Sequence, residues 1–131
     1  MNGDCLFRKE ERISSRKLID ALFSGGGSHS KSAFPLRVVY MLQERLCGQA
    51  PAQVLVSVPK RRFRHAVDRN RVKRQIREAY RLNKHPLVEA VPAGKAVFMA
   101  FIWLSDEHLP SAAIEERVRT LLTHITRQIS L

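Results

Sequence analysis

The chain has few cysteines and no long apolar segment, and both features limit the classes of protein to which it can belong. Among 131 residues only Cys5 and Cys47 are cysteines, and neither belongs to a CxxC pair. Two isolated thiols do not make a disulfide framework, so we expect free thiols in a reducing cytoplasm. The longest apolar run, residues 96–104, is too short for a helix that spans a bilayer. The N-terminus lacks the apolar stretch of a signal peptide, so we predict a cytoplasmic protein without membrane contact.

The chain also lacks the residue patterns of a self-sufficient enzyme. It has no paired carboxylates, no nucleophile elbow and no Cys–His arrangement. Three consecutive glycines, residues 25–27, follow a predicted helix rather than a strand, so they do not form a dinucleotide-binding loop. The five histidines do not have the spacing of a metal site. We therefore predict no catalytic residue and no metal ligand in this protein.

Acidic residues are scarce, and the basic residues are concentrated in one segment. The chain has 23 Lys and Arg against 12 Asp and Glu, which gives a formal net charge of +11. Residues 60–84 hold eleven of these Lys and Arg and only two acids, Asp68 and Glu78, so this segment carries +9. At such a density the positive charges repel one another and lower the stability of the protein, so we expect an anionic partner that offsets them. A nucleic-acid backbone fits best, because each neutralised phosphate releases counterions.

Length and residue patterning predict one domain, residues 1–131, of the α+β class. Residues 1–13 have the polar composition of an extended segment. Apolar residues at helical spacing predict a first helix that begins after Ser14 or Ser15 and ends at Gly25. Its apolar stripe consists of Leu18, Ile19, Leu22 and Phe23.

Three strands are predicted after this helix. Residues 34–42 alternate between two faces, and residues 53–58 form a second strand. The continuous apolar run 96–104 is typical of a central strand that is buried on both faces. Residues 28–32 are predicted as a loop, and an additional strand within 43–56 is left open.

Two longer helices complete the pattern, and the first of them is basic. It is predicted over residues 68–83, with Asp68 as its N-cap and with Val72, Ile76, Ala79 and Tyr80 facing the core. The last helix is predicted to begin at Ser111, as its cap, and its apolar residues at helical spacing are Ile114, Val118, Leu121, Leu122, Ile125 and Ile129. The resulting order is α-β-β-(β)-α-β-α, a sandwich with helices mainly on one face of the sheet. Such an arrangement leaves the other face free to bind a partner.

The beginning of the basic helix and the segment before it suit phosphate binding. Arg69 and Arg71 carry planar guanidinium groups that bind phosphate oxygens bidentately, and Asn70 both donates and accepts hydrogen bonds. Their other interpretation is a solvated basic face with Asn70 as a local cap. Lys60 and Arg61 leave the second strand and are able to follow a phosphate backbone.

The aromatic residues allow two interpretations, a stacking surface for bases or a hydrophobic core. For Phe63 and Tyr40 the pattern favours the core. For Phe7 and Phe23 the two interpretations stay open.

Residues 66–81, AVDRNRVKRQIREAYR, resemble the signature of the protein subunit of bacterial ribonuclease P. In that signature an RNR triplet precedes an apolar residue, a Lys-Arg pair, and an Arg-Glu pair before an aromatic residue. Residues 57–61 are similar to the strand end upstream of that motif. Phe7 with residues 12–13, and Phe23 with Gly26, resemble the N-terminal part of the family. The resemblance covers nearly all of residues 7–129.

The resemblance implies a small α+β fold with a left-handed βαβ crossover, whereas the general rule predicts the right hand. It also implies that the protein is not the catalyst. A large RNA subunit cleaves the 5′ leader from precursor tRNA with Mg²⁺, which is bound mainly by this RNA and the substrate. The implied holoenzyme has one protein and one RNA, and the protein alone is expected to be a monomer.

The family pattern also places the contacts. The contacts with the catalytic RNA would be Arg69, Asn70, Arg71, Lys73, Arg74 and Arg77. The 5′ leader would lie in a cleft between the sheet and the first helix, lined by Phe7, Ile19, Phe23, Phe34, Arg37, Lys60 and Arg61. Ile19 and Arg37 stand where some relatives have aromatic residues, so we expect weaker stacking and stronger charge contacts here.

Other functions remain as alternatives. A stand-alone RNA-binding or ribosomal protein would use the same basic helix but would not respond to a 5′ leader. A DNA-binding protein also uses basic helices, although no helix-turn-helix partner is evident here. A self-sufficient nuclease has no supporting residues in this chain.

Overall fold

In the computed structural model, the described residues are 11–13, 16–24, 27–46 and 48–130. They form four helices and four strands. In chain order these are α1 (Arg16–Phe23), β1 (His29–Ala33), β2 (Leu36–Glu44), β3 (Ala52–Ser57), α2 (Ala66–Asn83), α3 (His85–Ala90), β4 (Lys95–Trp103) and α4 (Ser111–Ile129).

The strands form one mixed sheet in the order β1-β2-β4-β3. β2 pairs antiparallel with both β1 and β4, whereas β3 runs parallel to β4. β4 therefore lies inside the sheet, and most of its residues are buried. The prediction of a central strand from the apolar run 96–104 is confirmed, because a strand packed on both faces has no polar side to alternate with.

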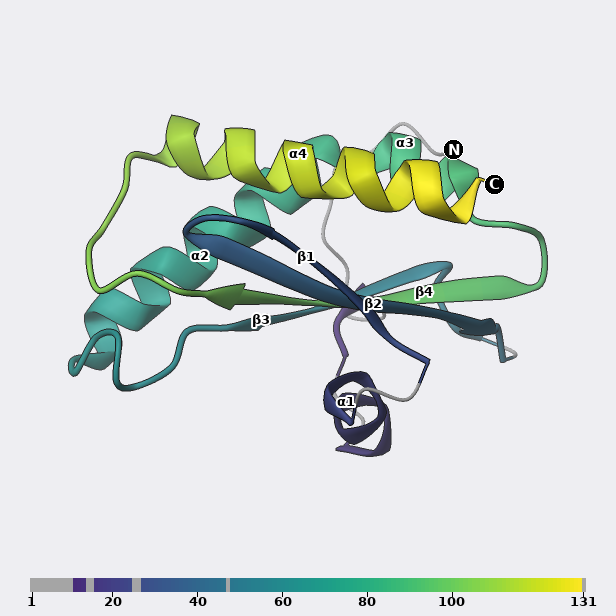
Figure 1. The fold of residues 1–131 in the computed structure, drawn as a ribbon, viewed down its shortest axis with the longest axis horizontal. Coiled ribbons are helices and arrows are strands. Elements are labelled where there is room, and N and C mark those ends of the chain that lie inside the picture. Colours follow the sequence, from purple (N-terminus) through teal and green to yellow (C-terminus); the bar gives the residue numbers. More distant parts are fainter. Residues whose placement is uncertain (1–10, 14–15, 25–26, 47, 131) are drawn as a thin grey trace.

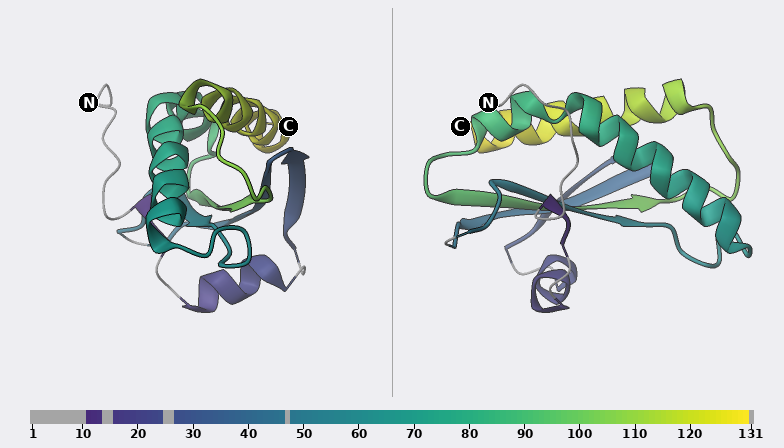
Figure 2. Two further views of the ribbon diagram at one scale, coloured as in Figure 1. Left: turned by 90° about the vertical axis from the view of Figure 1, so that its left-hand side faces the viewer. Right: turned by 180° about the vertical axis from the view of Figure 1, so that it is seen from behind.

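Helices cover both faces of the sheet, but unequally (Figure 1, Figure 2). α2, α3 and α4 lie together on one face, over the larger hydrophobic core. α1 lies on the opposite face, where fully buried Leu22 packs with Val39 and Met41 of β2. The expected free face is thus partly covered. The reason lies in β2, which is apolar on both sides and so needs cover on both.

The βαβ unit made of β3, α2 and β4 has the uncommon hand. The two strands are adjacent and parallel, and α2 crosses the face of the sheet between them. With α2 in front of the sheet and both strands pointing upward, β4 lies to the left of β3 (Figure 1, Figure 2). The crossover is therefore left-handed, as the family resemblance implied and against the general rule.

One strand lies where the sequence predicted a loop. β1 falls within the segment predicted to be irregular, and its residues are mostly exposed. It is held by pairing with β2, in which His29 lies opposite Tyr40. A polar edge strand has no apolar alternation, so hydrophobic patterning misses it. The additional strand that was left open within 43–56 is not observed among the described residues, apart from β3 itself.

The remaining differences concern the ends of elements. β2 begins at Leu36, so Phe34 lies in the turn between β1 and β2. α2 begins at Ala66 without a side-chain cap, and Asp68 lies inside its first turn instead of capping it. α3 is a short helix that contains Pro86 in its first turn, where proline costs no hydrogen bond.

The predicted core faces of the two long helices are confirmed. In α2 the buried residues are Val72, Ile76, Ala79 and Tyr80. In α4 they are Ile114, Val118, Leu121, Leu122, Ile125 and Ile129. The first residue of α4, Ser111, does not cap the helix; its hydroxyl accepts a hydrogen bond of 3.0 Å from the Gln75 amide of α2.

Candidate nucleic-acid interface

The outward side of α2 presents a basic surface, which we define as Asn70, Arg71, Lys73, Arg74 and Arg77. Asn70, Arg71 and Arg74 are exposed, whereas Lys73 and Arg77 are half-buried. The apolar residues of α2 fix this orientation, because they hold the opposite side of the helix against the core. The guanidinium groups of Arg71 and Arg74 therefore point away from the core, as contacts with phosphate require.

Arg69 differs from its neighbours because its side chain turns back onto the protein. Its Nη1 donates hydrogen bonds to the backbone oxygens of Phe63 and Arg64, at 2.8 and 3.0 Å. These carbonyls belong to the loop between β3 and α2. Arg69 thus fixes this loop against the helix, and its role includes positioning the loop that carries Lys60 and Arg61.

Lys60 and Arg61 are exposed in a turn that follows β3. The backbone N–H of Arg62 closes this turn on the Pro59 oxygen, at 3.0 Å. Arg62 then pairs with Asp106 at 3.3 Å, which ties the loop to the segment between β4 and α4. Two basic side chains are consequently presented on a fixed turn close to the beginning of α2.

Phe63 is a core anchor of this loop, as the sequence favoured. It is 8% exposed and stacks on the His108 ring, with centroids 4.5 Å apart and planes 15° apart. His108 Nε2 lies 3.1 Å from Asp68 Oδ1 in the first turn of α2. Asp68 therefore helps to join α2 to the β4–α4 segment, a role that its position in the sequence did not reveal.

Arg12 extends the basic surface beyond α2. It forms an isolated parallel bridge with Val54 of β3, and the neighbouring Ile13 N–H donates to the Val54 oxygen at 3.0 Å. Burial lowers the pKa of Arg77, and the positive charge of Arg12 lowers it further. Positive charges that interact in this way suit an anionic partner. The sequence indicated Arg12 only as part of the N-terminal resemblance, not as a contact.

The opposite face of the sheet brings together two of the predicted cleft residues. Phe23, at the end of α1, and Arg37, on β2, line one hollow of about 250 Å³. Phe23 is 49% exposed, whereas its neighbour Leu22 is fully buried, so Phe23 is not a core residue. Ile19 packs half-buried against the core beneath α1. An aromatic ring and a guanidinium beside each other suit a base and its phosphate.

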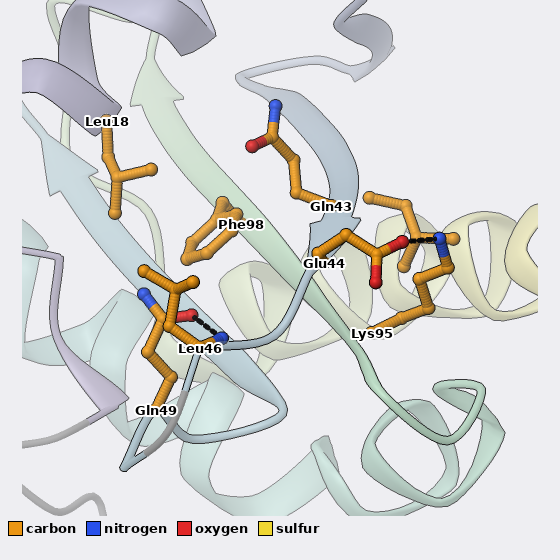
Figure 3. Close-up of a pocket in the computed structure, with 8 residues that line it drawn as sticks. Leu18, Gln43, Glu44, Leu46, Gln49, Lys95 and Phe98 are labelled. Atoms are coloured by element: carbon orange, nitrogen blue, oxygen red, sulfur yellow. Dashed lines mark hydrogen bonds and ion pairs between the residues drawn. The ribbon is translucent and has the colours of Figure 1, made fainter.

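A second hollow of about 440 Å³ opens on the same face (Figure 3). Its apolar lining includes Leu18 of α1 and Phe98 of β4. Glu44 lies at its rim, where it pairs with Lys95. The lysine offsets the charge of the carboxylate, which would otherwise repel an anionic ligand. The sequence did not indicate this hollow, because Leu18 and Phe98 have the spacing of ordinary core residues.

The other predicted cleft residues lie elsewhere. Phe34 is 68% exposed in the β1–β2 turn, where its backbone oxygen accepts a hydrogen bond from Arg117 Nε of α4 at 2.9 Å. It does not line either hollow beside α1, and neither do Lys60 and Arg61. Phe7 lies outside the described residues.

The described residues contain no group of three or more His, Cys, Asp or Glu side chains placed to hold a metal ion. Among the same residues, no helix has the length and apolarity needed to cross a membrane.

Comparison with known proteins identifies the family. A family model described as Ribonuclease P matches residues 7–126. The chain belongs to the ribonuclease P protein family. The ribonuclease P protein component of Porphyromonas gingivalis is 41% identical over 123 residues, which cover 92% of this chain and 87% of the relative. That of Chlorobaculum tepidum is 35% identical over 127 residues, covering 91% and 79%.

Solved structures of ribonuclease P proteins share the fold. The protein from Thermotoga maritima superposes with a TM-score of 0.67 at 22% identity, covering 88% of this chain and 97% of its own. The protein from Staphylococcus aureus gives a TM-score of 0.67 at 19% identity, covering 87% and 94%. The resemblance stated from residues 66–81 is thereby confirmed, and so is the α+β fold class.

Proposed function

We propose that this chain is the protein subunit of a ribonuclease P ribonucleoprotein that matures the 5′ end of tRNA. The observation that carries the proposal is the presence of two surfaces suited to RNA on different sides of one small protein. One is the basic surface of α2, and the other is the hollow that holds Phe23 and Arg37 beside α1. Two such surfaces allow one protein to bind two RNA segments at once.

In this proposal the basic surface of α2 binds the catalytic RNA. Arg71 and Arg74 are exposed and carry bidentate donors, so they bind phosphate oxygens directly. Asn70 lies between the two arginines of the RNR triplet and hydrogen-bonds a sugar hydroxyl or a phosphate. Lys73 and Arg77 extend the contact along the helix toward Arg12, while Arg69 holds the loop in place.

The hollow beside α1 binds the single-stranded 5′ leader of precursor tRNA. Phe23 stacks on a base, and Arg37 compensates the charge of the adjacent phosphate. Ile19 supports α1 from beneath. Lys60 and Arg61, on their fixed turn, attract the RNA backbone toward this side, and we place them at the rim of the complex rather than in the hollow.

The protein performs no chemical step in this proposal. The RNA subunit cleaves the leader with Mg²⁺ held mainly by RNA and substrate, which would make the protein an accessory subunit. Its contribution is electrostatic and positional. Catalytic RNA and precursor tRNA repel each other, and a +11 protein between them reduces that repulsion while it holds the leader.

The decisive experiment measures the binding of precursor tRNA, with and without its 5′ leader, to the RNA subunit in the presence and absence of this protein. We expect tighter binding of the substrate that carries a leader only when the protein is present. A matched cleavage assay at low Mg²⁺ should then show faster cleavage upon addition of the protein.

Equal binding of both substrates would contradict the leader-binding role. Such a result, with retained affinity for the RNA subunit, would favour a general RNA-binding or ribosomal protein. Cleavage of RNA by the protein alone would contradict the accessory role.

A further inference from the structure

A cavity of about 320 Å³ lies at the β1 edge of the sheet, on the side of α4. Its walls include His29 and Tyr40 from the β1–β2 hairpin, and Gln128 and Ile129 from the end of α4. The fold therefore provides a concave site on the face opposite α1. Nothing in the proposed contacts of α2 or of the Phe23 hollow uses this cavity.

Aromatic side chains pack against one another at this cavity, and one of them, His29, is exposed to solvent. The His29 ring lies over Tyr40, with centroids 5.5 Å apart and planes 39° apart. His124 of α4 meets the same tyrosine edge-on at 6.3 Å and 77°. Tyr40 is buried, whereas His29 is exposed. Tyr40 thus holds the imidazole of His29 from below, and an exposed imidazole is one of the side-chain surfaces on which RNA bases stack.

Hydrogen-bonding capacity is available at the same place. Within the described part of the chain, the side chains of His29 and Gln128 form no hydrogen bond or ion pair with another residue. Gln128 is exposed and carries both a donor and an acceptor, which suits the edge of a base. The cavity therefore combines a stacking ring with an amide, the two elements from which single-stranded RNA sites are built.

His29 also connects this cavity to the other face of the sheet. It lines the hollow that contains Phe23 and Arg37 as well as the cavity that contains Tyr40 and Gln128. β1 is the edge strand of the sheet, so an RNA chain has to cross only β1 to reach the other face. The neighbouring side chains are small or basic, such as Ser30 and Lys31, and are exposed.

We propose that the 5′ leader, after it leaves the hollow beside α1, continues around β1 and places a base of a more distal nucleotide in this cavity. His29 stacks on that base and Gln128 hydrogen-bonds its edge. This inference rests on the proposed function, because it extends the path of the same RNA strand. It adds a second leader-binding site, on the α4 side of the sheet, for a single-stranded nucleotide.

The test uses the reconstituted holoenzyme and precursor tRNAs whose leaders are lengthened one nucleotide at a time. Gln128→Ala reports on the cavity alone, because Gln128 does not line the hollow beside α1, and His29→Ala reports on the connection. Phe23→Ala reports on the first hollow. Thr123→Ala, an exposed change elsewhere on α4, is the matched control, and thermal unfolding verifies that every variant is folded.

The wild type should gain affinity in two stages as the leader grows. Phe23→Ala should remove the gain from short leaders. Gln128→Ala should keep that gain and lose the gain from longer leaders. His29→Ala should lower the affinity for longer leaders by at least about fivefold, which is the lower end for loss of a base-stacking residue. With 4-thiouridine placed at successive leader positions, crosslinks to α4 should arise only from the distal positions.

Two results would overturn the inference in distinguishable ways. Wild-type affinity of both cavity variants for long leaders, together with weakened binding by Phe23→Ala, would remove the second site and leave the proposed function intact. A holoenzyme that gains nothing from any leader would remove the proposed function and the inference together.

Discussion

Two arginines of the same triplet, Arg69 and Arg71, have different tasks. Arg69 donates hydrogen bonds to two backbone oxygens of the preceding loop, whereas the Arg71 side chain is exposed to solvent. Substitutions at the two positions should therefore affect different properties, stability in one case and RNA binding in the other. A change at position 69 removes the donor of two hydrogen bonds to the loop and loosens it, while a change at position 71 removes only a contact with the partner.

Arg71→Ala should weaken binding to the RNA subunit by about 1–3 kcal/mol, the cost of losing one bidentate phosphate contact. Its salt dependence should flatten by about one unit of slope, because one fewer counterion is released. The free energy of unfolding should stay within about 0.5 kcal/mol of wild type, as for an exposed residue. Filter binding at several salt concentrations and urea unfolding measure both quantities.

The control for this prediction is Arg69→Ala, which should lower both stability and RNA affinity. An unchanged salt slope for Arg71→Ala would mean that this side chain does not contact phosphate.

Phe23 and Leu22 offer a second matched pair, since they are adjacent on α1 but differ in burial. Phe23 is 49% exposed and Leu22 is fully buried. Phe23→Ala should weaken leader binding by about 1–3 kcal/mol, the cost of losing one stacked base, and should leave the fold intact. Leu22→Ala should instead destabilise the protein by about 2–5 kcal/mol. Fluorescence titration with a labelled leader and urea unfolding separate the two effects; a large loss of stability in Phe23→Ala would assign it to the core.

At the scale of elements, an ion pair joins the N-terminal segment to the end of α2. Lys84 Nζ lies 2.7 Å from Glu11 Oε1, and the two side chains are only 7% and 12% exposed. Tyr80 lies in the same region, where burial raises its pKa and the charge of Glu11 raises it further. Because Glu11 precedes Arg12, this pair also holds Arg12 at the edge of β3, near Arg77.

Glu11→Ala should therefore lower the free energy of unfolding by roughly 3–5 kcal/mol, since it removes the carboxylate of a buried ion pair. Glu44→Ala is the matched control, because Glu44 is 77% exposed in its pair with Lys95 and should cost less than about 1 kcal/mol. Equilibrium urea unfolding of the two variants measures both values. Equal and small losses would show that the buried pair does not secure the N-terminal segment.

The same scale shows how far the sequence could predict this fold. Apolar periodicity predicted α1, α2, α4 and the central strand, because each buries a continuous stripe or run. It missed β1, whose exposed residues are specified by pairing with β2 rather than by burial. It also placed Phe34 in a strand, although Phe34 and Pro35 form the turn before β2, which begins two residues later at Leu36.

The candidate site was predictable to a similar degree. The basic surface of α2 follows from local sequence, because core residues on one side of a helix fix the direction of the others. The meeting of Phe23 with Arg37, and of Arg12 with Arg77, depends on packing between elements distant in the chain. Patterns within one segment do not carry that information, and for Phe23 and Arg37 only the family resemblance indicated a shared site.

At the scale of the whole molecule, the charge is distributed unevenly. Residues 60–84 carry +9 of the net +11, and in space they form α2 and the loop before it. α4 also has arginines, but Glu115 and Glu116 lie near Arg119 and Arg117 and offset them. If position rather than total charge determines binding, variants with the same net charge should bind RNA differently.

The double variant Lys73→Ala/Arg74→Ala and the double variant Arg119→Ala/Arg127→Ala both lower the formal charge from +11 to +9. The first should reduce the slope of log K against log salt by roughly 1.5–2 units for the RNA subunit, because two phosphate contacts are lost. The second should change the slope by much less, since exposed charges beyond about 10 Å are screened at 0.1 M salt. Equal losses in the two variants would mean that the protein acts as a diffuse polycation, and the oriented contact assigned to α2 would then be wrong.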